Sequence, residues 1–183
     1  KNQSGRNVWM YFDGLESMGK ASIEYNLVSR RFNQSICQFA NSIYPNENNI
    51  STCMTEKTNH DGVFLILKDD VTKYYDYFEP VVLKYDIKTL TDGYPSFNFG
   101  ICKGMTFDRV LIYPNKSLKD FIFGKELRSP QKYYVAVTRP RYSIAIVLDE
   151  FPNVPLYKTE IICFGNTQIT TKRFIGGESS KED

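Results

Sequence analysis

The sequence is poor in the side chains that most often bind metal ions. It has a single histidine, His60, and its four cysteines are far apart, with no Cys-x-x-Cys pair. Zinc sites are built from clusters of His and Cys, so we expect no metal site. Isolated cysteines of this kind are typical of reduced thiols in a cytoplasmic protein, and we expect that location.

Long apolar runs and a strong excess of one charge are also missing. No apolar run approaches the roughly 20 residues of a membrane-spanning helix, and no signal peptide is visible, so we expect no membrane contact. The chain has 23 basic and 21 acidic residues among 183, a net charge of +2. A protein that coats nucleic acid is usually strongly basic, although a local basic strip remains compatible with this balance. Because the sequence begins with Lys1 rather than Met, we expect a piece of a longer protein.

Short apolar runs alternate with helical patterns, which is typical of an α/β fold with a mostly parallel sheet. Strands are predicted over residues 8–12, 23–28, 63–67, 81–85, 96–101, 110–113 and 143–149, with 162–164 as a further edge strand. Helices are predicted from Asn33, over 71–78 after Asp70 as a cap, and from Ser129–Pro130 to about Arg139. We expect one domain over residues 1–166 and a flexible tail over 167–183.

The stretch GLESMGKAS, residues 14–22, is one residue short of a phosphate-binding loop. Gly14, Gly19 and Lys20 fit the Gly-x₄-Gly-Lys pattern, but Ala21 replaces the Ser or Thr that should hold magnesium. The residues that follow alternate like a strand and do not open a helix. The sequence therefore favours a surface turn. A self-contained P-loop NTPase stays an alternative, with Asp149 as its nearest Walker B acid.

Basic residues mark three predicted element ends. Arg30 and Arg31 lie between a strand and a helix, where parallel sheets and helix N-termini favour ligands and phosphate. Lys103 supplies charge in a loop where Gly104 permits close backbone approach. Arg139 lies at a helix end, and arginine suits bidentate phosphate recognition. Taken singly, each stretch is equally compatible with a solvated turn or a helix cap.

Together, these stretches resemble motifs IV, V and VI of superfamily 1 helicases of the UvrD/Rep/PcrA type. Motif IV, roughly Asn-Tyr-Arg-Ser with a later Ala-Asn, is similar to SRRF at 29–32 and AN at 40–41. The resemblance places Arg31 on the arginine that approaches the nucleotide γ-phosphate, and Arg30 on an aromatic that stacks on adenine. Motif VI, Tyr-Val-Ala-x-Thr-Arg-Ala-Arg, is similar to YVAVTRPR at 134–141. It makes Arg139 the arginine finger.

Motif V, Thr-x-His-x-x-Lys-Gly-Leu-Glu-Phe-Asp, resembles NFGICKGMTFD at 98–108. The family uses this motif to contact the DNA backbone and to couple it to nucleotide. The resemblance thus implies DNA contacts by Asn98, Gly100 and Lys103, and a place in the nucleotide site for Gly104 and Thr106. Gly100 replaces the family histidine, and Thr106 replaces the family glutamate.

The first residues, KNQS, resemble the end of motif III, Gly-Asp-x-x-Gln-Ser, with Gln3 on the family glutamine. If that match holds, Trp9 or Tyr11 would stack on bases of single-stranded DNA. It is equally compatible with the sequence that these two aromatic side chains belong to the core or to a strand.

The resemblance implies a three-layer RecA-like (P-loop NTPase-like) fold, and specifically the C-terminal RecA-like domain, called 2A. In the family, the Walker A and Asp-Glu Walker B motifs belong to the N-terminal RecA-like domain, and this chain has neither. ATP and Mg would then bind mainly to that domain of the same polypeptide, with single-stranded or duplex DNA as partner. The chain alone is predicted to be monomeric and inactive. The alternative is a helicase-like binding module without ATPase coupling, which the substitutions at Arg30, Gly100 and Thr106 motivate.

Overall fold

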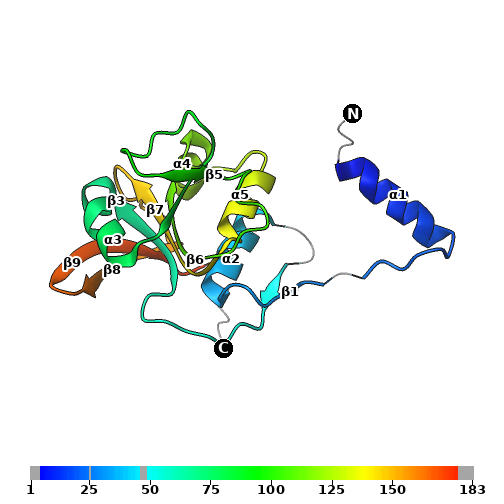
Figure 1. Ribbon diagram of the computed structural model, residues 1–183, viewed down its shortest axis with the longest axis horizontal. Helices are drawn as coiled ribbons and strands as arrows, with labels where there is room; N and C mark the ends of the chain where they lie inside the picture. Colours follow the sequence, from blue (N-terminus) through cyan, green and yellow to red (C-terminus); the bar gives the residue numbers. More distant parts are fainter. Residues whose placement is uncertain (1–4, 25, 46–48, 177–183) are drawn as a thin grey trace.

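A seven-stranded, mostly parallel sheet forms the centre of the molecule, between two layers of helices (Figure 1). The computed structural model describes residues 5–24, 26–45 and 49–176. Its strands follow the order β5-β4-β6-β7-β3-β9-β8, and the first five are parallel to one another. Strand β9 runs antiparallel to both of its neighbours, β3 and β8. The predicted three-layer α/β fold class is confirmed.

The strands of the central sheet combine long buried runs with a partly exposed edge hairpin. Their bounds are β3 Gly62–Leu67, β4 Val81–Lys84, β5 Ser96–Asn98, β6 Phe107–Tyr113, β7 Pro140–Leu148, β8 Tyr157–Phe164 and β9 Thr167–Phe174. Parallel strands covered on both faces read as continuous apolar runs, and the prediction of β3, β4, β6 and β7 from such runs is confirmed. A separate parallel pair joins β1 Val28–Ser29 to β2 Ser51–Thr52.

Helices cover both faces of the sheet. The core on one face contains side chains from α2 Gln34–Ile43, α4 Lys116–Ile122 and α5 Gln131–Val137. On the other face lies α3 Val71–Phe78, which follows the short 3₁₀ turn Lys68–Asp70. The predicted helices α2, α3 and α5 are therefore confirmed, whereas α4 was not predicted. Asp70 precedes α3 as expected, but its carboxylate accepts from Lys73 Nζ at 2.7 Å and makes no side-chain cap.

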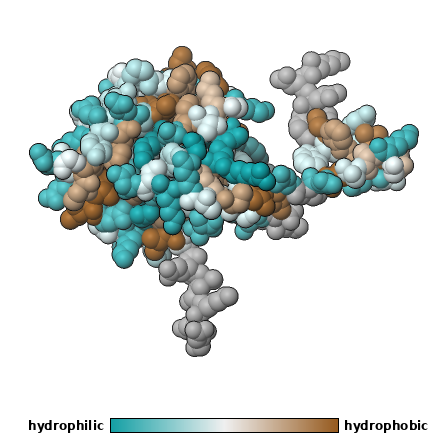
Figure 2. All heavy atoms as spheres, turned by 60° about the horizontal axis from the view of Figure 1, so that its bottom comes forward, coloured by the Kyte–Doolittle hydropathy of each residue, from teal (hydrophilic) through white to brown (hydrophobic). Residues whose placement is uncertain are grey.

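The prediction of a strand over residues 8–12 is wrong, because this segment lies within helix α1, Gly5–Ser17. The helix stands apart from the rest of the molecule (Figures 1 and 2), and Met10 and Tyr11 on it are more than 60 % exposed. A strand needs a neighbour to satisfy its backbone, whereas a helix bonds within itself. Away from the sheet, the helix is the state that leaves fewest unpaired groups. Of the strand expected over 23–28, only Val28 lies in a strand, β1, among the described residues.

The prediction of a flexible tail from residue 167 is also wrong over Thr167–Phe174. These residues form β9, which pairs with both β3 and β8 inside the sheet. Its side chains alternate between buried and exposed, with Ile169 and Thr171 buried. An antiparallel strand with one face toward solvent accommodates so polar a sequence, TQITTKRF. Residues 177–183, the rest of the expected tail, lie outside the described residues.

Candidate functional site

Three arginines from two distant parts of the chain line one pocket of about 530 Å³. Arg30 and Arg31 come from the turn between β1 and α2, and Arg139 follows the C-terminus of α5. We call this cavity the arginine pocket. Its full lining is Asn26, Leu27, Val28, Ser29, Arg30, Arg31, Phe32, Ile50, Tyr134, Thr138 and Arg139.

Hydrogen bonds from Asn33, the N-cap of α2, bring the two arginine-bearing segments together. Its Oδ1 accepts from Ile36 N at 3.1 Å, which starts the helix. Its backbone N donates to Arg141 O at 3.1 Å, and its Nδ2 donates to Tyr142 O at 2.6 Å. The start of α2 is thereby fixed to the start of β7, and Arg31 lies close to Arg139.

The guanidinium of Arg139 is held in place by neighbouring oxygens. Its Nε donates to Val135 O at 2.8 Å, and its Nη2 donates to Thr138 Oγ1 at 3.1 Å. Its Nη1 donates to Met105 O at 3.4 Å. A guanidinium carries five N–H donors, so these bonds leave one N–H on each terminal nitrogen. The half-buried side chain is therefore fixed and still able to bind a second acceptor.

The arginine pocket carries more positive charge than its surroundings neutralise. Within the described residues, no carboxylate forms an ion pair with Arg30, Arg31 or Arg139. Burial, and then the nearby charge of Arg31, lower the pKa of Arg139. By contrast, Arg141 lies 2.6 Å from a carboxylate oxygen of Glu56. Two like charges brought together without a counter-ion favour the binding of an anion.

The loop between β5 and β6 joins the same site through its backbone. Besides the contact of Arg139 with Met105 O, Phe107 N donates to Arg139 O at 3.1 Å. Gly104 has a positive φ of 87°, which glycine adopts without strain. Gly104 and Thr106 are exposed, but the lining of the arginine pocket does not include either one. Their predicted contact with nucleotide stays a prediction.

The three residues predicted to contact DNA lie at the start of this loop and in its middle. Asn98 ends β5 beside Lys84 of β4 and is half-buried. Its Oδ1 is buried with no hydrogen-bond partner among the described residues. Gly100 and Lys103 are exposed to solvent. Lys103 is thus free to reach a phosphate, whereas Asn98 reaches solvent much less.

The stretch that resembles a phosphate loop is the end of a helix. Gly14 lies within α1, and Gly19 ends it with a positive φ of 65°. Gly19 N donates to Glu16 O at 2.8 Å, and Lys20 N donates to Leu15 O at 2.9 Å. These two bonds form the Schellman motif that closes many helices. The amides that would bind phosphate are therefore already used, and the alternative of a self-contained P-loop loses its support.

We expect Lys20→Ala to leave the affinity of the chain for Mg-ATP unchanged, because Lys20 lies on a helix cap. Gly19→Ala should cost about 1 kcal/mol of local stability and fray the end of α1, which amide exchange would report. Isothermal titration calorimetry measures the first effect. Tight Mg-ATP binding that disappears in Lys20→Ala would restore the phosphate-loop reading.

The remaining predictions concern two aromatic residues, the motif III match and the Walker B candidate. Tyr11 is exposed on α1 and not on a strand, and the same holds for Trp9. Gln3 and the rest of the motif III match lie outside the described residues. Asp149, the Walker B candidate, accepts from Lys119 Nζ at 2.6 Å.

Among the helices of the described ranges, none has the length and apolar character needed to cross a bilayer. In the same ranges, no three or more His, Cys, Asp or Glu side chains are grouped as a metal site would need.

Comparisons with known proteins find viral helicases among the solved structures. The arterivirus nonstructural protein 10 helicase in complex with DNA is 19 % identical, with 78 % of this chain and 28 % of that chain covered and a TM-score of 0.47. Another structure of that arterivirus helicase is 21 % identical, with coverages of 80 % and 29 % and a TM-score of 0.47. The PRRSV helicase is 18 % identical, with coverages of 80 % and 30 % and a TM-score of 0.42. The chain thus spans less than a third of these helicases. No family model and no curated protein matches it.

Proposed function

We propose that this chain is the C-terminal RecA-like domain, 2A, of an ATP-dependent superfamily 1 helicase or translocase of the UvrD/Rep/PcrA type. ATP and Mg bind mainly to the N-terminal RecA-like domain of the same polypeptide. Arg139 and Arg31 approach the γ-phosphate from this domain. The observation that carries the proposal is the convergence of Arg31 and Arg139 on one pocket, at the positions where the motif resemblance expects them.

The position of Arg139 supports a role in phosphoryl transfer. Its contacts with Val135 and Thr138 hold the guanidinium before any ligand arrives. Donors that are already oriented stabilise developing charge without reorganisation. The two remaining N–H groups suit two oxygens of a phosphate. Arg139 is therefore suited to stabilising charge on the transferring phosphoryl group.

The two arginines before α2 supply charge and a planar surface. Arg31 is exposed and near enough to Arg139 to lower its pKa. A γ-phosphate between the two would turn this repulsion into a pair of attractions. Arg30 replaces the adenine-stacking aromatic of the family, and a guanidinium also stacks on flat rings. We assign Arg31 to the phosphate and Arg30 to the base.

The loop between β5 and β6 provides a physical link between nucleotide and DNA. Met105 and Phe107 are bonded to Arg139 through the backbone, and Lys103 lies exposed two residues before Met105. A movement of Arg139 toward phosphate would therefore act on the segment that presents Lys103. In this proposal, closure on ATP and opening after hydrolysis shift the two domains along one strand of DNA.

Lys103→Ala is expected to weaken binding of single-stranded DNA by the full-length protein for all sequences alike. Removing one phosphate contact should lower the slope of log K against log salt by about 1. Fluorescence anisotropy over a salt series measures both quantities. Lys158→Ala, an exposed lysine on β8, is the matched control. An equal loss in both variants would contradict a specific role for Lys103.

The experiment that tests the proposed function is ATP hydrolysis by the full-length protein with and without single-stranded DNA. We expect turnover that rises on addition of DNA. The alternative function is a helicase-like binding module without ATPase coupling, which the substitutions at Gly100 and Thr106 favour. Salt-sensitive DNA binding without turnover would support that alternative and contradict the motor.

A further inference from the structure

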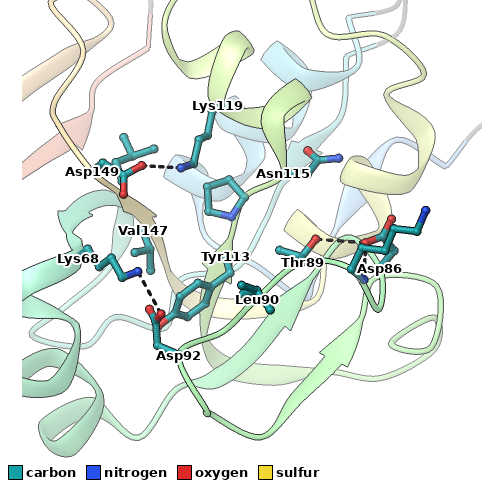
Figure 3. Close-up of a pocket in the computed structure, with 13 residues that line it drawn as sticks. Lys68, Asp86, Thr89, Leu90, Asp92, Tyr113, Asn115, Lys119, Val147 and Asp149 are labelled. Carbon is teal, nitrogen blue, oxygen red and sulfur yellow. Dashed lines mark hydrogen bonds and ion pairs between the residues drawn. The ribbon is translucent and has the colours of Figure 1, made fainter.

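A second pocket, of about 460 Å³, lies at the carboxyl ends of the parallel strands (Figure 3). We call it the switch pocket. Its lining is Lys68, Asp86, Lys88, Thr89, Leu90, Asp92, Tyr113, Pro114, Asn115, Lys119, Val147, Leu148 and Asp149. These residues belong neither to the arginine pocket nor to the loop between β5 and β6, so the proposed function does not use them.

The topology of the sheet marks this place as a ligand site. After β4 the chain turns toward β5 on the face that α3 covers, where Tyr94 packs on Tyr75 at 4.4 Å between ring centroids. After β6 the chain turns the other way, toward β7, through α4 and α5 on the opposite face. The neighbouring strands β4 and β6 therefore lead in opposite directions. In open α/β sheets, ligands bind in the crevice outside the carboxyl ends of two such strands.

A buried hydroxyl without a partner lies in this crevice. Tyr113 ends β6 and is 6 % exposed. Its hydroxyl oxygen is buried and makes no hydrogen bond with any described residue. Its ring lies between Asp92 and Leu90 (Figure 3). Burial, and then the charge of Asp92 and the close approach of its carboxylate to the hydroxyl, raise the pKa of Tyr113, so the hydroxyl keeps its proton at neutral pH. An unpaired buried hydroxyl costs free energy that a bound polar group would recover.

Three lysines and three aspartates line the switch pocket, and two of each form ion pairs. Lys68 Nζ lies 3.1 Å from Asp92 Oδ1, and Lys119 Nζ lies 2.6 Å from Asp149 Oδ2. Lys88 is exposed and takes part in no ion pair within the described ranges.

The third carboxylate of the pocket, on Asp86, is occupied locally. Asp86 Oδ1 accepts from Lys88 N at 3.0 Å and from Thr89 Oγ1 at 3.3 Å. The side chain of Lys88 thus remains the group most available to an anion, although the negative charge of Asp86 in the same pocket weakens the attraction.

The loop that carries Lys88 also supplies an apolar side chain to the pocket. Leu90 is 84 % exposed, so its side chain is accessible to a ligand. Val147 and Leu148, at the end of β7, lie on the same pocket. A flat ring placed against Leu90 would remove this apolar surface from water. The pocket thus combines an apolar wall, a hydroxyl and a cation.

We propose that the switch pocket binds a nucleoside monophosphate. Its phosphate lies at Lys88, its base lies against Leu90, and the Tyr113 hydroxyl bonds to the sugar or the base. The volume of about 460 Å³ falls within the range of small-molecule sites, roughly 300–1,000 Å³. This site is distinct from the arginine pocket and does not depend on the proposed motor function.

The test is calorimetric titration of AMP into the 183-residue chain and its variants. Lys88→Ala should weaken AMP binding about tenfold, as expected for the loss of one charge-assisted contact. Lys158→Ala should leave it unchanged. No AMP binding, or binding that Arg139→Ala removes and Lys88→Ala spares, would overturn the proposal.

Tyr113→Phe separates a binding role from a structural one. Because the hydroxyl makes no hydrogen bond of ordinary geometry and lies near the Asp92 carboxylate, the variant should unfold at the same temperature or a higher one, yet bind AMP more weakly by about threefold or more. A lower unfolding temperature with unchanged AMP affinity would contradict the proposal. Adenosine and inorganic phosphate should each bind more weakly than AMP. Phosphate alone binding as well as AMP would overturn the nucleoside part.

Discussion

Arg139→Ala should lower kcat for ATP hydrolysis by the full-length protein about 10³-fold or more. The affinity for ATP should change little, because the proposed function has the phosphates bound mainly by the other RecA-like domain. An arginine that acts only as charge develops on the transferring phosphoryl affects kcat and kcat/KM together. The guanidinium of Arg139 is held for this task by Val135, Thr138 and Met105. Steady-state kinetics of purified variants measures the effect.

Two further variants sharpen the result. Arg139→Lys keeps the charge but not the planar fork, and it should recover only a small part of the activity. Arg128→Ala removes an exposed arginine just before α5, outside the arginine pocket, and should leave kcat unchanged. Unchanged turnover in Arg139→Ala would contradict the proposal that Arg139 is the arginine finger.

Mild acid should destabilise the chain through its only histidine. His60 is 6 % exposed and lies between the rings of Phe64 and Phe78, whose centroids are 4.2 and 4.1 Å away. Its Nε2 is 2.8 Å from the Tyr74 hydroxyl. Burial, with smaller contributions from the positive charges of Arg109 and Arg173, lowers the pKa of His60 to about 3. The folded protein thus keeps this imidazole neutral well below pH 6.

The sign of the effect follows from proton binding. Below its ordinary pKa of about 6.5, His60 takes up a proton in the unfolded chain but not in the folded one. Stability is therefore full above this pH and is lost as the pH falls toward 3. Between pH 7 and pH 5 the loss should be about 2 kcal/mol. Urea unfolding at the two pH values measures it.

The control is His60→Gln, which removes the only group that titrates in this way in that range. The variant should be less stable at pH 7 because it disturbs the ring stack, but the change between pH 7 and pH 5 should be much smaller. An equal loss of stability in the variant would show that His60 is not the cause.

The sequence predicted the elements that are either fully buried or buried along one face. The apolar run of β3 and the i, i+3, i+4, i+7 spacing of α2 identify a fully buried strand and a one-faced helix. The sequence misled where tertiary context decides. VWMYF has the composition of a strand, but α1 has no sheet neighbour and bonds within itself. The hairpin of β8 and β9 carried a usable signal, the turn Gly165–Asn166, where Gly165 has a positive φ.

The sequence proposes candidate site residues as a list but does not predict their arrangement. Motif order selected Arg31 and Arg139, yet nothing local in either segment indicates that they meet. The hydrogen bonds of Asn33 to Arg141 and Tyr142 bring the two segments together. Hydrophobic periodicity does not predict hydrogen bonds between residues so far apart in the sequence. The switch pocket was missed for a similar reason. It depends on the order of β4 and β6 in the sheet, which only the structure gives.

The central claim, that Arg139 acts on the γ-phosphate in the transition state, is tested most directly with ADP and aluminium fluoride. The ADP–fluoride complex imitates the transferring phosphoryl, and transition-state analogues bind far more tightly than ground-state ligands. The full-length protein with Mg should bind ADP with aluminium fluoride much more tightly than ADP alone. Arg139→Ala should lose most of this preference while its affinity for ADP stays the same. A preference that survives the substitution would contradict the account.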